Sequence, residues 1–133
     1  MAALDTNLLV RFLVEDDAAQ LAAARRLIRK CVRAGEALFV PVTVALELEW
    51  VLRSSFGFSK SVVMQTLAQL LATTELTFQS EGAIEVALVL CSRGAADFSD
   101  CLHGALAHHA GQSPLWTFDK AASKLEGARL LTT

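Results

Sequence analysis

Four acidic residues each end or interrupt an apolar run at a point where the sequence turns polar. They are Asp5, Glu47, Asp100 and Asp119. A carboxylate beside so much apolar sequence is costly unless its charge is compensated. No Lys or Arg occupies the matching place in each run. Because one shared divalent cation would compensate all four charges, the pattern predicts a metal-dependent enzyme.

The composition predicts a single domain that exposes some apolar surface. The chain has 133 residues, 53% of them hydrophobic and only 20% charged. That length suffices for one core over residues 1–133, and we expect another chain to cover part of the apolar surface. The net charge of −2 argues against a broad basic platform for nucleic acid. A nucleic-acid substrate would need local basic patches or a bound metal.

The cysteines and the N-terminus predict a cytoplasmic protein. Cys31, Cys91 and Cys101 have no metal-ligand spacing and fit buried thiols in a reducing compartment. The N-terminus has no basic segment, and Asp5 breaks its apolar stretch. We expect no signal peptide and no membrane span of about 20 apolar residues.

Short apolar runs alternate with helical patterns along the whole chain. The sequence predicts strands at 1–5, 37–41, 76–79, 115–118 and 129–131. It predicts helices at 6–13, from Asp16 or Asp17 to about 33, at 44–55, 60–72 and 81–92, from Asp97 to about 110, and at 121–125. Expected N-caps are Asp5 or Thr6, Thr43 and Ser59. Such alternation is typical of a parallel sheet with helices on both faces.

Glu47 differs from its neighbour Glu49. Glu49 has Arg53 at i+4, in the favourable Glu-before-cation order, so we expect an ordinary surface pair. Glu47 has no cation at i±3 or i±4. It is either an exposed carboxylate at a helix edge or a ligand.

Asp97 and Asp100 offer a second comparison. Asp97 is well placed as a helix N-cap, and Asp100 falls at the third helical position, where an acid complements the helix dipole. Capping accounts for Asp97 and explains Asp100 less well. Asp5 and Asp119, by themselves, also fit a cap and a turn residue. Both follow predicted strands, at the sheet edge where open α/β proteins form their sites.

Several neighbours are candidates for supporting roles. Thr6, Asn7 and Thr117 flank the acids and are placed to orient them, although capping explains them equally well. His103 lies one turn from Asp100. Candidate phosphate contacts are Arg11, Lys120 and the basic cluster Arg25–Arg33, whose alternative role is a solvated helix face.

The chain resembles the PIN-domain nucleases, and more closely the VapC-type toxins of bacterial toxin–antitoxin pairs. The matching segments are Leu4–Leu13, Leu46–Leu52, Ala96–His103 and Thr117–Asp119. The resemblance implies a three-layer α/β/α sandwich with a central parallel sheet of four to five strands. It also implies an Mg²⁺- or Mn²⁺-dependent endoribonuclease that leaves 5′-phosphate and 3′-hydroxyl ends.

The same resemblance assigns roles to residues and partners. Asp5, Glu47, Asp100 and Asp119 would be the catalytic and metal-binding acids, with Asp97 as a further candidate ligand. Relatives usually form homodimers and are inhibited by a VapB-like antitoxin encoded beside the toxin.

Other classes remain open at this point. A housekeeping PIN-like nuclease that processes RNA is one alternative. A receiver-type signalling domain would show adjacent acids after its first strand, whereas Asp5 is single. A haloacid-dehalogenase-type phosphatase needs an acid where Asn7 stands. A metal-free interaction module would show no thermal shift with Mg²⁺.

Overall fold

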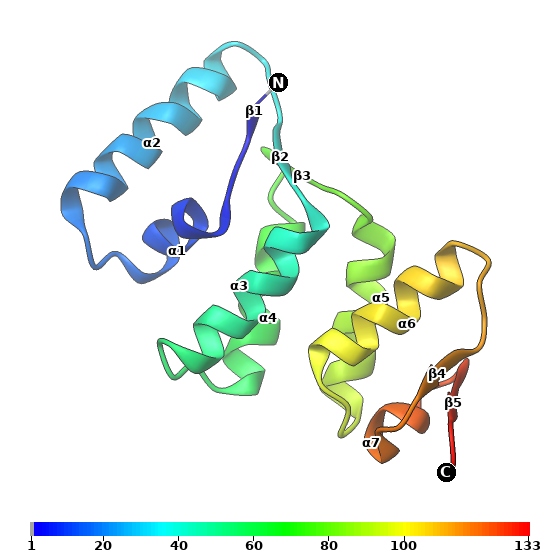
Figure 1. The fold of residues 1–133 in the computed structure, drawn as a ribbon. Coiled ribbons are helices and arrows are strands. Elements are labelled where there is room, and N and C mark those ends of the chain that lie inside the picture. Colours follow the sequence, from blue (N-terminus) through cyan, green and yellow to red (C-terminus); the bar gives the residue numbers. More distant parts are fainter. Residues whose placement is uncertain (1) are drawn as a thin grey trace. The chain divides into compact units, whose positions relative to one another are not determined.

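Strands and helices alternate along the chain in the computed structural model, which describes residues 2–133 (Figure 1). The elements divide between two compact units, residues 1–79 and residues 80–133. All strand pairs within each unit are parallel, as the alternation predicts. The five strands form a three-stranded sheet in the first unit and a two-stranded sheet in the second.

The sheet of the first unit has the order β1-β2-β3. Its strands are β1 (Ala2–Ala3), β2 (Leu38–Val40) and β3 (Leu76–Phe78). The central strand β2 pairs with β1 on one side and with β3 on the other. Leu38 and Val40, which alternate with the half-buried Phe39, are fully buried. This strand therefore forms the centre of the core of the first unit.

Four helices complete the first unit. They are α1 (Thr6–Val14), α2 (Ala18–Arg33), α3 (Val42–Ser54) and α4 (Lys60–Leu71). Helix α1 packs against α2 and α3, and α3 packs against α4. The predicted cap Ser59 is confirmed, and the other two caps are Asp5 and Asp17, each one of two predicted alternatives. Each of the three side chains accepts a hydrogen bond from a first-turn amide. The cap of α1 places Asp5 two residues beyond the end of β1.

Helix α3 begins differently from the prediction. Thr43 is not its N-cap; Pro41 holds that position and has no capping side chain. The amide of Val42 instead donates to Oε1 of Gln79, 37 positions along the chain, at 3.0 Å. Gln79 directly follows β3, so the end of one strand caps the helix that carries Glu47.

Replacing Gln79 by Ala should destabilise the protein by about 1 kcal/mol, the usual cost of losing a helix cap. The reason is that one first-turn amide of α3 loses its acceptor. Urea unfolding measures the effect. Gln79→Glu retains an acceptor oxygen and should stay near wild type, as should Gln112→Ala at an exposed loop position. Equal stability of Gln79→Ala and Gln112→Ala would contradict this role.

The second unit is built on two packed helices and a small sheet. Its elements are α5 (Glu81–Arg93), α6 (Phe98–His109), β4 (Leu115–Thr117), α7 (Lys120–Ser123) and β5 (Ala128–Leu130). Helices α5 and α6 pack together, and α6 also contacts β4. Ile84, Phe98 and Leu102 are almost completely buried. Helix α6, which carries Asp100, therefore contacts strand β4, which precedes Asp119.

Two further expectations concern the whole chain. Cys31, Cys91 and Cys101 are buried, as predicted. Within residues 2–133, every helix is too short or too polar to cross a bilayer.

Candidate functional site

Asp100 is the acidic residue whose electrostatics are most perturbed. It lies in the first turn of α6 and is half-buried. Burial raises its pKa above the ordinary value, and the negative charges of Asp119 and Asp97 raise it further, while His103 acts in the opposite direction. Such mutual repulsion requires that Asp97, Asp100 and Asp119 lie near one another. The second unit therefore gathers three carboxylates and one imidazole around the start of α6.

Asp119 is held in place by two local hydrogen bonds. Its Oδ1 accepts from the amide of Ala122 at 2.9 Å, which makes it the N-cap of α7. Its own amide donates to Oγ1 of Thr117 at 3.0 Å. The structure thus gives Thr117 an orienting contact, made to the backbone of Asp119 rather than to its carboxylate. One carboxylate oxygen of Asp119 serves as the cap and the other remains for a ligand.

Asp97 behaves differently from the capping residue that the sequence suggests. It occupies the N-cap position of α6, but its side chain makes no capping hydrogen bond. The carboxylate is exposed and repels Asp100. Asp97 therefore occupies the predicted N-cap position but does not cap the helix with its side chain. Its carboxylate is more available as a ligand than the sequence predicts.

Asp5 occupies a comparable place in the first unit. It follows β1, and its Oδ1 accepts from the amide of Leu8 at 3.0 Å as the N-cap of α1. The next residue, Thr6, is 4% exposed, and its Oγ1 has no hydrogen-bond partner among the described residues. A buried hydroxyl without a partner is unusual in a folded protein. Asp5 thus sits beside a polar group with unused hydrogen-bonding capacity.

Glu47 lies on α3, the helix that packs against α1. It is exposed, and no Lys or Arg pairs with it in the part of the chain that the structure describes. The predicted pair of its neighbour is confirmed, since Arg53 Nε lies 2.9 Å from Glu49 Oε2. The expected surface location of Glu49 is wrong, because this side chain is buried. Glu49 thus has Arg53 as its partner, whereas Glu47 has no cationic partner among the described residues.

Burial does not distinguish all four acids, contrary to the prediction from their apolar neighbours. Only Asp100 is half-buried, whereas Asp5, Glu47 and Asp119 are exposed. Their charges are therefore not costly through desolvation, and the caps of Asp5 and Asp119 account for their positions at strand ends. What distinguishes the acids is repulsion within the group around Asp100, not burial of all four. Asp5 and Glu47 belong to the first unit, and Asp100 and Asp119 belong to the second.

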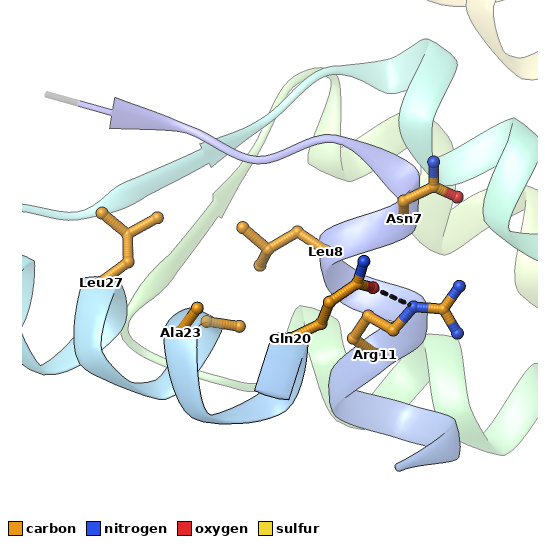
Figure 2. A pocket seen from close by; sticks show the side chains of 7 residues that line it. Asn7, Leu8, Arg11, Gln20, Ala23 and Leu27 are labelled. Atoms are coloured by element: carbon orange, nitrogen blue, oxygen red, sulfur yellow. Dashed lines mark hydrogen bonds between the residues drawn. The ribbon is translucent and has the colours of Figure 1, made fainter. Parts of the chain in front are cut away.

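The remaining candidates in the first unit line a pocket between α1 and α2. This open pocket has a volume of about 360 Å³, and Asn7 and Arg11 belong to its wall (Figure 2). The guanidinium of Arg11 bonds to Gln20 and Asp16, which ties the end of α1 to the start of α2. A phosphate would have to compete with these partners for Arg11. Leu8 points from α1 towards Ala23 and Leu27 on α2 (Figure 2).

The donor groups fit a hard divalent cation. Such ions prefer carboxylate oxygens and reduce the repulsion between neighbouring acids. Burial raises the pKa of Asp100, and the negative charges of Asp119 and Asp97 raise it further, so a nearby cation would offset part of this cost. Across residues 2–133, no three His, Cys, Asp or Glu side chains already lie close enough to enclose an ion together. The fit therefore rests on the chemistry and the charge of the donors.

Comparison with known proteins agrees with this chemistry. A family model described as PIN domain matches residues 2–128 and so spans both units. No curated protein matches the chain. PIN domains have a three-layer α/β/α fold, which confirms the predicted fold class, and they are in general nucleases that depend on divalent metal ions.

Proposed function

The chain belongs to the PIN-domain family, whose members are in general nucleases, and on that premise we propose that it is an Mg²⁺- or Mn²⁺-dependent endoribonuclease. We further propose that it is the VapC-type toxin of a toxin–antitoxin pair and acts in the cytoplasm as a single domain over residues 1–133. The family assignment disfavours the receiver-type and phosphatase alternatives.

One observation carries the proposal most strongly. Burial raises the pKa of Asp100, and the charges of Asp119 and Asp97 raise it further, so three carboxylates share one small region of the second unit. Like charges kept together at a cost in stability are typical of functional sites. The proposed metal ligands are Asp5, Glu47, Asp100 and Asp119, and Asp97 is a further candidate.

The chain's own residues would prepare the site for phosphodiester hydrolysis. A bound divalent ion supplies Lewis-acid chemistry, which makes water more acidic and offsets charge on the phosphate. The caps of α1 and α7 hold one oxygen of Asp5 and one of Asp119, and leave the other oxygen for a ligand. Thr117 fixes the backbone of Asp119. No Ser or Cys nucleophile is needed in this scheme.

Removing metal tests the proposal. The purified protein should cleave single-stranded RNA with Mg²⁺ or Mn²⁺, and excess EDTA should abolish cleavage. Saturating Mg²⁺ should also raise the melting temperature, because a ligand at 100 times its Kd stabilises the folded state by about 2.7 kcal/mol. Cleavage that persists in EDTA, without any thermal shift by Mg²⁺ or Mn²⁺, would contradict the proposed mechanism.

The toxin assignment implies partners, which we propose to be a second copy of the chain and a VapB-like antitoxin. Several large apolar side chains are exposed and would be covered by such partners. They are Val32, Trp50, Val62, Val86, Val89, Trp116, Phe118, Leu130 and Leu131. The pocket between α1 and α2, lined in part by Leu8, Ala23 and Leu27, suits an apolar antitoxin segment. Val62 on α4 is a further exposed apolar residue that we propose for antitoxin binding.

The antitoxin site can be tested with two neighbouring alanines on α2. Ala23 lines the pocket, whereas Ala22 is exposed outside it. Ala23→Gln should weaken binding of the product of the adjacent gene roughly tenfold or more, since a bulky polar group in an apolar contact costs about 1–3 kcal/mol. Ala22→Gln should bind normally, and both variants should cleave RNA normally. Equal affinities of the two variants, measured by calorimetry, would place the antitoxin elsewhere.

A further inference from the structure

Helix α2 concentrates positive charge on its exposed side. It carries five cations and no acid between Ala18 and Arg33. They are Arg25, Arg26, Arg29, Lys30 and Arg33, and all five are exposed. The whole chain has a net charge of −2, so this helix differs sharply from the average surface. The buried residues Ala24 and Cys31 lie on the other side of the helix.

Most of this charge is uncompensated. Arg25 lies 3.6 Å from Glu15, a long contact between two exposed groups. Arg29 Nε donates to the carbonyl oxygen of Arg25 at 3.3 Å, which orients the guanidinium without neutralising it. For Arg26, Lys30 and Arg33, no acidic partner occurs among residues 2–133. Neighbouring cations that repel one another and lack acids favour an anionic ligand.

The side chains also shape a hollow. An open space of about 380 Å³ is lined, among residues 2–133, by Arg26, Arg29, Lys30 and Arg33 alone. This space is separate from the apolar pocket between α1 and α2, whose wall includes Ala23, Ala24 and Leu27. The helix therefore presents two chemically different surfaces, one apolar and one purely cationic.

We propose that the cationic face of α2, defined as Arg26, Arg29, Lys30 and Arg33, docks the phosphate backbone of the RNA substrate. This inference rests on the proposed nuclease function and identifies the surface that binds the substrate. Carboxylates around Asp100 repel RNA wherever a metal does not neutralise them, so a cationic surface elsewhere would add attraction for the substrate. Three guanidiniums suit phosphate oxygens, which they can bind in bidentate fashion.

An acidic protein segment is the competing occupant, and the hollow suits it less well. Protein interfaces usually have an apolar core, whereas nucleic-acid backbone contacts are polar and hydrated. The lining of the hollow contains four charged residues and no apolar residue. RNA backbone is therefore the occupant that the chemistry favours.

The test uses the full chain carrying Asp100→Asn, so that RNA is bound without being cut. A fluorescent single-stranded RNA is titrated at several salt concentrations, with and without Arg26→Gln, Arg29→Gln and Arg33→Gln. Each lost phosphate contact lowers the slope of log K against log salt by about 0.7 for a single strand. The triple variant should therefore lose about 2 from the slope and bind roughly tenfold or more weakly at low salt. The matched control Arg93→Gln, Lys124→Gln and Arg129→Gln removes equal charge from exposed positions of the second unit and should change the affinity by less than about twofold.

Each outcome decides the matter. Equal RNA binding by the triple variant and the matched control would overturn the docking surface while leaving the proposed nuclease intact. Competition by poly-glutamate as strong as that by RNA would assign the surface to acidic ligands in general and overturn the RNA assignment. Failure of the parent protein to bind RNA would overturn this inference, whereas metal-dependent cleavage tests the proposed function separately. In the otherwise unaltered chain, the triple variant should raise KM and leave kcat near wild type.

Discussion

Replacing Asp100 by Asn will abolish RNA cleavage and will make the metal-free protein more stable. The loss of activity should exceed about 100-fold, since removal of groups that merely support a metal ligand already costs 10–100-fold. The gain in stability arises because an asparagine at this position has no charge that burial penalises or that Asp119 and Asp97 repel. The effect is at most about 1 kcal/mol after screening by solvent, or roughly 4 °C in melting temperature. Cleavage assays and thermal unfolding measure the two effects.

The gain in stability should depend on pH. The folded protein raises the pKa of Asp100, so the folded state binds this proton more tightly than the unfolded state. The contribution of Asp100 to stability therefore falls as the pH rises from the ordinary pKa of Asp through the raised value. The variant should gain most at neutral pH, and its advantage should vanish below about pH 3, where Asp100 is protonated in both states.

A matched substitution separates the site from helix electrostatics. Glu81 lies in the first turn of α5, as Asp100 lies in the first turn of α6. Glu81→Gln should leave cleavage unchanged and should not stabilise the protein. An Asp100→Asn variant that cleaves RNA like Glu81→Gln, or melts below wild type without metal, would show that Asp100 is an ordinary helix residue.

Replacing Asp5 by Asn will abolish cleavage without affecting stability. Asn caps helices about as well as Asp, so the bond from the amide of Leu8 can be retained. What is lost is a charged metal ligand, and the activity should fall by more than about 100-fold. The free energy of unfolding should stay within about 0.5 kcal/mol of wild type.

Asp17 provides the control for this prediction. It caps α2 through the amide of Gln20 at 3.0 Å, the same distance as in the Asp5 cap. Asp17→Asn should therefore match Asp5→Asn in stability and match wild type in cleavage. If both variants cleaved RNA like wild type, Asp5 would only be a helix cap, as Asp17 is.

The sequence predicts the element order because local signals agree with the fold. Apolar runs, cap residues and glycines place the helices and strands within a few residues, and the caps Asp17 and Ser59 are those expected. Strands β1 and β2 are shorter than predicted, since hydrogen-bonded pairing rather than apolar content sets their ends. Gly57 adopts φ +68° in the turn between α3 and α4, a conformation that glycine adopts readily.

What the sequence cannot give are contacts between distant segments. The cap of α3 by Gln79 joins positions 37 apart, and no local pattern announces it. The bonds from Arg11 to Asp16 and Gln20 depend on how the loop after α1 turns. Glu49 is buried, although its i,i+4 spacing to Arg53 is also typical of an exposed ion pair. Repulsion between Asp100 and Asp119 likewise depends on the packing of α6 against β4.

Titration of Mn²⁺ into three proteins tests the central claim, that Asp5 and Asp100 are both metal ligands. Calorimetry would compare wild type, Asp5→Asn and Asp100→Asn. If both acids are ligands, wild type should bind Mn²⁺ and each substitution should lower the affinity by roughly tenfold or more. A wild-type protein that binds no Mn²⁺, or variants that bind it as tightly as wild type, would contradict this claim.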